Sequence, residues 1–116
     1  MSQAQPITQV FVASVASTLH GHWEEISQGQ RSTRHSHGGD IIVVTVEVGY
    51  GGSRIARLNG SIMQQYREEL ITSRGVVVGF ARYWRGYLRG SGHFEYQTTS
   101  TVHPFDTWRI SFSIRS

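Results

Sequence analysis

The chain has 116 residues, with 11 Arg and no Lys, 8 acidic residues and 6 His, so its formal net charge is +3 when the His side chains are neutral. That length suits a single domain spanning residues 1–116, with a core that needs no covalent cross-links. The absence of Cys excludes a disulfide scaffold, a thiol nucleophile and Cys-ligated metals. No apolar run reaches the roughly 18 residues of a transmembrane helix.

The positive charge is spread along the chain, and only Arg82, Arg85 and Arg89 lie close together in the sequence. Nucleic-acid binders usually gather basic residues in a stripe, so nucleic acid is not an expected partner. Residues 1–6 lack the charged and apolar regions of a signal peptide. The protein is therefore either cytosolic or a mature form whose leader was replaced by Met. The small polar start and the Ser-, Thr- and Gly-rich segments favour a secreted bacterial protein.

Apolar alternation and β-branched residues predict a series of strands. They cover residues 7–17, 22–27, 40–50, 54–58, 75–88, 92–102 and 108–115, with a polar surface loop over 28–39. Residues 40–50 give the clearest pattern, because Ile42, Val44, Val46 and Val48 share one face. The pattern predicts an all-β fold, an antiparallel β-sandwich or a jelly-roll-like domain.

Residues 61–72 are ambiguous. Ser61 and Gln64 have the spacing of a capping box, and Ile62, Tyr66 and Leu70 fall on one helical stripe. We expect a short helix here, with a polar edge strand as the alternative. The preceding Asn59-Gly60 is a hairpin-type turn signal.

Gly90-Ser91 has the composition of a two-residue hairpin turn, which would pair residues 75–88 with 92–102. In that register one face holds apolar residues and is assigned to the core: Val77, Ala81, Tyr83, Tyr87, Phe94, Tyr96 and Val102. The opposite face near the turn holds a polar and aromatic set: Arg82, Trp84, His93, Glu95 and Gln97.

An indole surrounded by polar side chains suits a sugar, whose C–H faces stack on an aromatic ring while its hydroxyl groups need planar polar partners. Arg82, Trp84, His93, Glu95 and Gln97 are therefore the predicted ligand-binding residues for a glycan or another polar cell-surface group. The alternative is that Trp84 packs under a neighbouring segment and that Arg82 and Glu95 form a cross-strand ion pair.

The histidines form two His-x-His pairs, His20 with His22 and His35 with His37. On a strand, residues two apart share a face, so each pair can offer two imidazoles to one metal ion. Together with neighbouring acidic residues, the four histidines are candidate ligands for Zn²⁺ or Cu²⁺. The alternative is that they are solvated surface residues.

Two other classes of function stay open. A small secreted hydrolase would use metal bound by the histidines, or it would cleave RNA with His103 as acid or base beside an Arg and Glu95. An interaction protein, such as a toxin component, an inhibitor or a self-assembling homo-oligomer, would use an exposed apolar patch formed by Val76, Val78 and Phe80.

The segment 35–60 carries three short motifs: His37-Gly38-Gly39-Asp40, the run from Glu47 to Gly52, and the run from Arg54 to Gly60. This combination of motifs resembles the YolA-like small secreted bacterial proteins. The resemblance implies an exported bacterial domain of unknown function and assigns no functional residue. Taken with the polar-aromatic face, it favours an extracellular, non-catalytic β-sandwich that binds a glycan.

Overall fold

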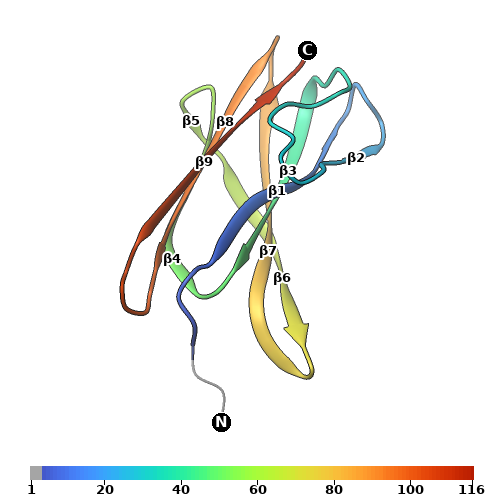
Figure 1. The fold of residues 1–116 in the computed structure, drawn as a ribbon. Coiled ribbons are helices and arrows are strands. Elements are labelled where there is room, and N and C mark those ends of the chain that lie inside the picture. Colours follow the sequence, from blue (N-terminus) through green and yellow to red (C-terminus); the bar gives the residue numbers. More distant parts are fainter. Residues whose placement is uncertain (1–3) are drawn as a thin grey trace.

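A computed structural model, which describes residues 4–116, confirms an all-β fold made of two antiparallel sheets that pack face to face (Figure 1). The large sheet has the strand order β2-β1-β3-β7-β6, and the small sheet has the order β5-β4-β8-β9. The strands are β1 (Gln9–Ser17), β2 (Trp23–Glu25), β3 (Gly39–Val48), β4 (Gly51–Leu58), β5 (Ser61–Ile62), β6 (Gln64–Ser73), β7 (Val76–Leu88), β8 (Gly92–Ser100) and β9 (Thr107–Ile114).

The core lies between the two sheets and follows the alternation of the central strands. Ile41 and Val43 of β3 are fully buried, as are Phe94 of β8 and, within a few per cent, Phe112 and Ile114 of β9. Because alternate residues of a strand point to opposite faces, each strand gives every second side chain to this core. The predicted inward face of 108–115 is thus confirmed, with Phe112 and Ile114 fully covered.

The predicted hairpin at Gly90-Ser91 is wrong, because the chain changes sheets at this point. β7 pairs with β3 and β6 in the large sheet, whereas β8 pairs with β4 and β9 in the small sheet. The two long strands therefore face each other across the core instead of lying side by side. A short Gly-containing connection serves either geometry, so the sequence signal was the same for both.

This crossing reverses the predicted core face of β7. Phe94 and Tyr96 on β8 are buried as expected, but on β7 the residues that point inward are Arg82, Trp84 and Leu88. Tyr83, Ala81 and Tyr87 alternate with them and point to the outer face of the large sheet.

The predicted helix over 61–72 is also wrong: residues 61–62 form β5 and residues 64–73 form β6. β6 is the edge strand of the large sheet, and its register with β7 shifts at two places. Those irregularities break the two-residue period, and the helical spacing of Ile62, Tyr66 and Leu70 is accidental. Among residues 4–116 there is no helix that is long and apolar enough to span a membrane.

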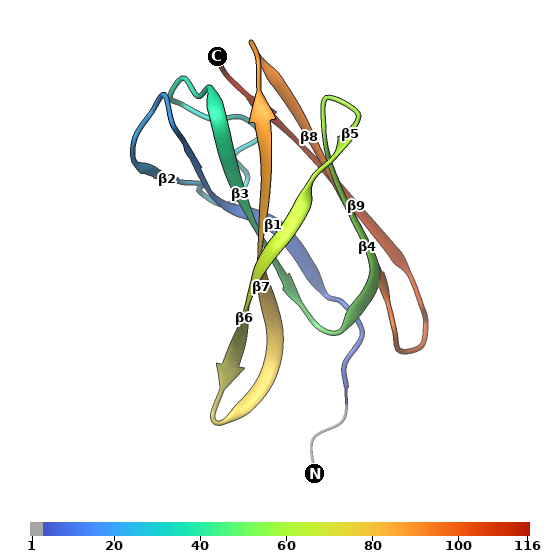
Figure 2. The ribbon, with the colours of Figure 1, turned by 180° about the vertical axis from the view of Figure 1, so that it is seen from behind.

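The predicted turn at Asn59-Gly60 is confirmed, and a turn of the same kind that was not predicted lies at Arg74-Gly75. Asn59 and Gly60 both have positive φ, 51° and 83°, as a type I′ hairpin turn requires, and they join β4 to β5. Arg74 and Gly75 do the same between β6 and β7. The β6–β7 hairpin extends beyond the rest of the large sheet, as Figure 2 shows from behind.

A buried ion pair lies in the core. Nη1 of Arg82 on β7 is 2.6 Å from Oε1 of Glu47 on β3, and the two side chains are 2% and 1% exposed. Nη1 makes no hydrogen bond of standard geometry to a described residue, so its contact with Glu47 is an ion pair. Nε of Arg82 also donates to Glu68 on β6 at 3.1 Å.

The small sheet completes the surroundings of Glu47. The hydroxyl of Tyr96 on β8 donates to Oε1 of Glu47 at 2.5 Å, and the hydroxyl of Thr98 donates to Oε2 at 3.4 Å. Burial and the neighbouring Glu47 carboxylate raise the pKa of the Tyr96 hydroxyl. In the same layer, the indole N–H of Trp84 donates to the Thr45 hydroxyl at 2.9 Å. Glu47 therefore joins the two sheets through polar contacts inside the core.

We expect Glu47→Gln to destabilise the fold by about 3–5 kcal/mol, because it leaves the buried Arg82 guanidinium without its closest counter-charge. Urea unfolding followed by circular dichroism measures this loss. The control is Arg67→Gln, which breaks a largely exposed ion pair with Glu69 and should cost no more than about 1 kcal/mol. Equal effects of the two substitutions would contradict the importance of the buried pair.

Candidate ligand-binding face

The five predicted ligand-binding residues do not share a surface. Arg82 and Trp84 are 2% and 4% exposed and lie in the core. The other three lie on the outer face of the small sheet, where His93 is 3.8 Å from Glu95, and Arg109 donates to the side chain of Gln97 at 3.1 Å. The crossing at Gly90-Ser91 separates the two groups, so the polar-aromatic face predicted from the hairpin register does not exist.

A different aromatic surface lies on the outer face of the large sheet. Trp23 of β2, Tyr83 of β7 and Tyr66 of β6 form a row, with ring centroids 6.2 Å apart between Trp23 and Tyr83 and 6.0 Å apart between Tyr83 and Tyr66. The rings meet edge to face, an arrangement that aromatic pairs prefer. Trp23 and Tyr66 remain 47% and 41% exposed. We call these three residues the aromatic row.

The aromatic row lies over small and aliphatic side chains of β1 and β3. Ala16 pairs in register with both Trp23 and Ile42, and Val44 pairs with Tyr83. Val44 is only 5% exposed although it points away from the core. Side chains of the outer face must therefore cover it, so the row belongs to a packed layer and has restricted freedom.

A β-bulge places Tyr66 in this row. On β6, Gln65 pairs with Trp84 and Arg67 pairs with Tyr83, so Tyr66 is the extra residue between two consecutive pairs. A bulge re-aims the side chain at its position. Sequence reasoning missed this role because it read Tyr66 as part of a helical stripe.

Charged groups flank the aromatic row on the β6 side. The guanidinium of Arg85 lies 5.0 Å from the ring centroid of Tyr66, and that of Arg67 lies 5.2 Å from the centroid of Tyr83. Glu69 accepts a hydrogen bond from the Tyr83 hydroxyl at 2.5 Å. This bond, together with partial burial, raises the pKa of Tyr83, so its hydroxyl stays protonated.

A hollow of about 280 Å³ lies at the other end of the row, beside Trp23. Its lining is Ala16, Ser17, Thr18, Gly21, His22, Trp23, Asp40 and Ile42. The hollow thus combines an indole with hydroxyl, imidazole and carboxylate groups. A hollow with apolar area and a few polar groups is the usual composition of a small-ligand site.

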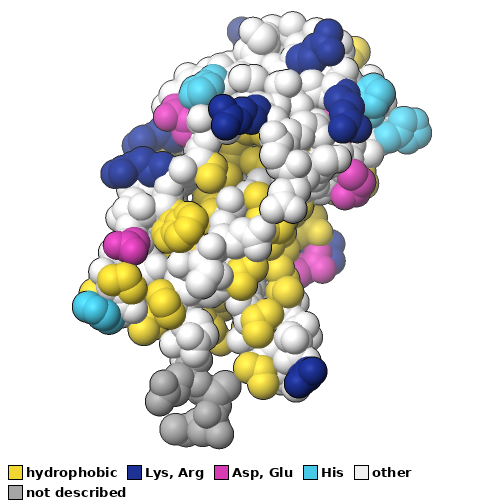
Figure 3. Space-filling model, in the orientation of Figure 1, with side chains coloured by type: hydrophobic (Ala, Val, Ile, Leu, Met, Phe, Trp, Pro, Cys, Tyr) yellow, Lys and Arg dark blue, Asp and Glu magenta, His cyan; other side chains and the backbone are white. Residues whose placement is uncertain are grey.

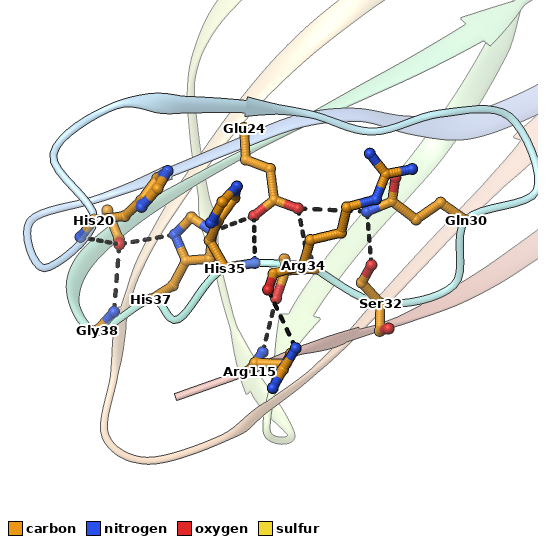
Figure 4. A network of polar contacts seen from close by, with 11 residues as sticks. His20, Glu24, Gln30, Ser32, Arg34, His35, His37, Gly38 and Arg115 are labelled. Atoms are coloured by element: carbon orange, nitrogen blue, oxygen red, sulfur yellow. Dashed lines mark hydrogen bonds and ion pairs between the residues drawn. The ribbon is translucent and has the colours of Figure 1, made fainter.

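The structure brings the four predicted metal ligands close together, at the loops before β2 and before β3. Figure 4 shows three of them, His20, His35 and His37. The ring of His20 is 4.7 Å from that of His35, 5.0 Å from that of His37 and 5.9 Å from that of His22. In the described part of the chain, however, no three His, Asp or Glu side chains are arranged to hold a metal ion. The rings of His20 and His35 stack with an interplanar angle of 19°, which does not aim their nitrogens at a common point.

His37 is occupied by protein partners. Its Nε2 is 3.0 Å from Oε1 of Glu24, and its Nδ1 is 2.8 Å from the Ser17 hydroxyl. His37 is fully buried, and Glu24 and Ser17 nearly so. With a proton on Nε2, the imidazole donates to the Glu24 carboxylate and accepts from Ser17.

Glu24 is the centre of this network, and the loop 26–38 wraps around it (Figure 4). Its carboxylate accepts hydrogen bonds from the backbone N–H groups of Arg34 at 2.7 Å and His35 at 3.1 Å, and from the Gln30 amide at 3.3 Å. Burial by itself would raise the pKa of Glu24, but the hydrogen bonds from Arg34, His37 and His35 outweigh burial, and the pKa is lowered.

The same loop reaches the edge of the small sheet. The backbone N–H of Thr33 donates to the carbonyl of Ser113 at 2.9 Å, and that of His37 donates to the carbonyl of Arg115 at 2.8 Å. The Thr33 hydroxyl accepts from the backbone N–H of Arg115 at 2.9 Å. The loop therefore ties β2 in the large sheet to β9 in the small sheet. We call Glu24, His37 and Ser17 the loop clamp.

The order serine, histidine, glutamate in the clamp resembles a hydrolytic triad, but its hydrogen bonds assign it a structural role. The Ser17 oxygen accepts from the backbone N–H groups of His20 at 3.2 Å and Gly38 at 3.3 Å. Those two bonds occupy the lone pairs that a nucleophile needs. The other hydrolase set is also dispersed, because His103 lies in the loop after β8 and Glu95 lies about 16 Å up that strand.

The lowered pKa of Glu24 gives the clamp a defined pH dependence. A carboxylate whose pKa is lower in the folded state contributes stability above its unfolded value, about 4.5, and this contribution disappears as the pH falls through the folded value. We expect Glu24→Gln to reduce stability at pH 7 and to have a smaller effect at pH 3. Urea unfolding of both proteins at the two pH values measures this difference. An effect of the substitution that is the same at both would contradict the role of the ionised carboxylate.

Comparison with known proteins places the chain in a family. A model described as a domain of unknown function, DUF4879, matches residues 2–114, which is nearly the whole chain. No curated protein and no solved structure gives a significant match. The YolA-like resemblance in residues 35–60 is thus supported only at the level of an uncharacterised family. The chain belongs to the DUF4879 family.

Proposed function

We propose that the protein is a secreted, non-catalytic module that binds a glycan on the outer face of its large sheet. The single observation that carries the proposal is the aromatic row, in which Trp23 and Tyr66 stay exposed while anchored to a packed sheet. A ligand that stacks on rings already held in place loses little free energy to ordering the protein. Secretion and a YolA-like identity are part of this proposal.

The chemistry around the row fits a sugar better than a purely apolar ligand. The exposed rings of Trp23 and Tyr66 offer apolar area to the C–H faces of a pyranose. The hollow beside Trp23 offers Asp40, Thr18 and His22 to its hydroxyl groups. The row runs from one edge strand of the large sheet to the other, so it can contact more than one sugar unit of a chain.

We expect Trp23→Ala and Tyr66→Ala each to weaken glycan binding by about tenfold or more, equivalent to about 1.4 kcal/mol, because each removes a stacking surface. A glycan array identifies the ligand, and affinity electrophoresis in a gel containing that polysaccharide measures the change. The wild-type protein should also show a change in Trp fluorescence on binding that Trp23→Ala abolishes.

The matched control is Phe105→Ala, which removes an aromatic ring that is 58% exposed in the loop between β8 and β9. This variant should bind like the wild type. The proposal fails if the folded wild-type protein binds no glycan on the array. It also fails if Trp23→Ala binds as tightly as Phe105→Ala.

A further inference from the structure

The first half of β1 is an unpaired sheet edge. β1 pairs with β3 along its whole length, but on its other side β2 covers only Ser14–Ala16. No described strand lies next to Gln9–Val12 on that side. A strand with one free side presents backbone N–H and C=O groups that can pair with another extended chain.

The core is also incompletely covered along this edge. A groove of about 320 Å³ follows it, lined by Gln9, Val10, Phe11, Val12, Ile26, Ser27, Gln28 and Gly29. The partly exposed side chains that pack against the core include Val10, Ile26 and Ile110 of β9, the strand that faces β1. In Figure 3, hydrophobic side chains accordingly gather across the middle of the view, where β1 and β9 lie.

The opposite edge of the large sheet is protected and this one is not. β6 carries Arg67, Glu68 and Glu69 in its centre and has two irregularities in its register. Charged side chains and bulges are the devices that keep edge strands from pairing with other molecules. The groove along β1 has no charged residue and no Pro in its lining. β1 has a register shift of its own, between Val12 and Ser14, but residues 9–12 before it pair regularly with β3. The two edges therefore differ chiefly in charge, and the uncharged β1 edge lacks the main protection of β6.

We propose that this edge pairs with the same edge of a second copy of the chain. Residues 9–12 of the two molecules would run antiparallel about a two-fold axis, joining their large sheets into one. A two-fold axis brings the same residues of the two copies together. A charged residue at this edge would therefore meet a like charge on the partner, whereas the uncharged lining of the groove produces no such repulsion. Only another extended polypeptide has N–H and C=O groups spaced to form hydrogen bonds along a strand. Phe11, which is 37% exposed, adds apolar area to the contact.

The size of the contact predicts its strength. Four residues of strand span about 13 Å, and contacts this short lie at the small end of specific interfaces, which are usually weak. The expected dimer is therefore concentration-dependent. The proposal does not depend on glycan binding, because the aromatic row contains none of residues 9–12.

Sedimentation velocity and light scattering from about 1 μM to about 1 mM test the proposal, since weak dimers dissociate within this range. The wild type should shift from the monomer mass to twice that mass. Phe11→Lys should stay monomeric, because it places two positive charges close to the axis. Gln9→Lys tests the same edge without removing apolar area, and should weaken the dimer at least tenfold.

Leu70→Lys is the matched control, since it introduces the same charge at a 58% exposed apolar position on β6. It should dimerise like the wild type, and circular dichroism checks that all the variants are folded. Slower amide exchange of residues 9–12 at high concentration would support strand pairing. The proposal is overturned if the wild type stays monomeric at the highest concentration, if both edge variants dimerise normally, or if only Leu70→Lys disrupts the dimer.

Discussion

The ion pair between Arg82 and Glu47 constrains how the two sheets can pack. Moving two charges out of water is unfavourable, and the penalty is offset only when both find close partners. Both charged residues belong to the large sheet, but the Tyr96 and Thr98 hydroxyls that complete the shell of Glu47 come from the small sheet. A shift of one sheet against the other would separate these groups. Apolar side chains tolerate such a shift far better. The buried polar contacts of Glu47 with Arg82, Tyr96 and Thr98, which we call the polar layer, therefore specify how the two sheets are aligned.

The same layer explains a glycine whose role is not visible in the sequence. A Cβ at Gly51 would collide with the Glu47 carboxylate and the Thr98 hydroxyl. The first residue of β4 therefore has to lack a side chain so that the carboxylate can fit between the sheets. In the sequence, Gly51 reads only as the end of the preceding strand. The structure shows a different reason for this glycine: the Glu47 carboxylate and the Thr98 hydroxyl occupy the space that its side chain would fill.

Placing charged and polar groups inside leaves apolar and aromatic groups outside. β7 turns Arg82 and Trp84 inward, so Tyr83 must face outward, where it meets Trp23 and Tyr66. The large sheet thus carries a packed layer on each face, the core on one side and the aromatic row on the other. Proteins rarely leave connected aromatic surface exposed without a partner, and this is the physical basis of the proposed binding face.

The sequence predicted the strands and turns much better than it predicted which strands pair and which residues meet in the core. The alternation of Ile42, Val44 and Val46 was enough to identify β3, and Asn59-Gly60 was enough to identify a hairpin. Nothing local distinguishes a hairpin at Gly90-Ser91 from a crossing between sheets, because both need a short flexible connection. The inward position of Arg82 depends on Glu47, which is 35 residues earlier, so alternation alone assigned it to the surface. For the same reason the five residues predicted to share one face are divided between the core and the outer face of the small sheet.

The hydrogen bonds between the loop 26–38 and β9 affect the order in which the chain can fold. The loop 26–38 obtains half of its anchors from β2 and the other half from Ser113 and Arg115. Contacts so distant in sequence form late, after the entropy of closing the intervening chain has been paid. During synthesis the loop can therefore close on Glu24 early, through bonds between residues 10 to 13 apart, but it stays unattached to the small sheet until β9 has left the ribosome.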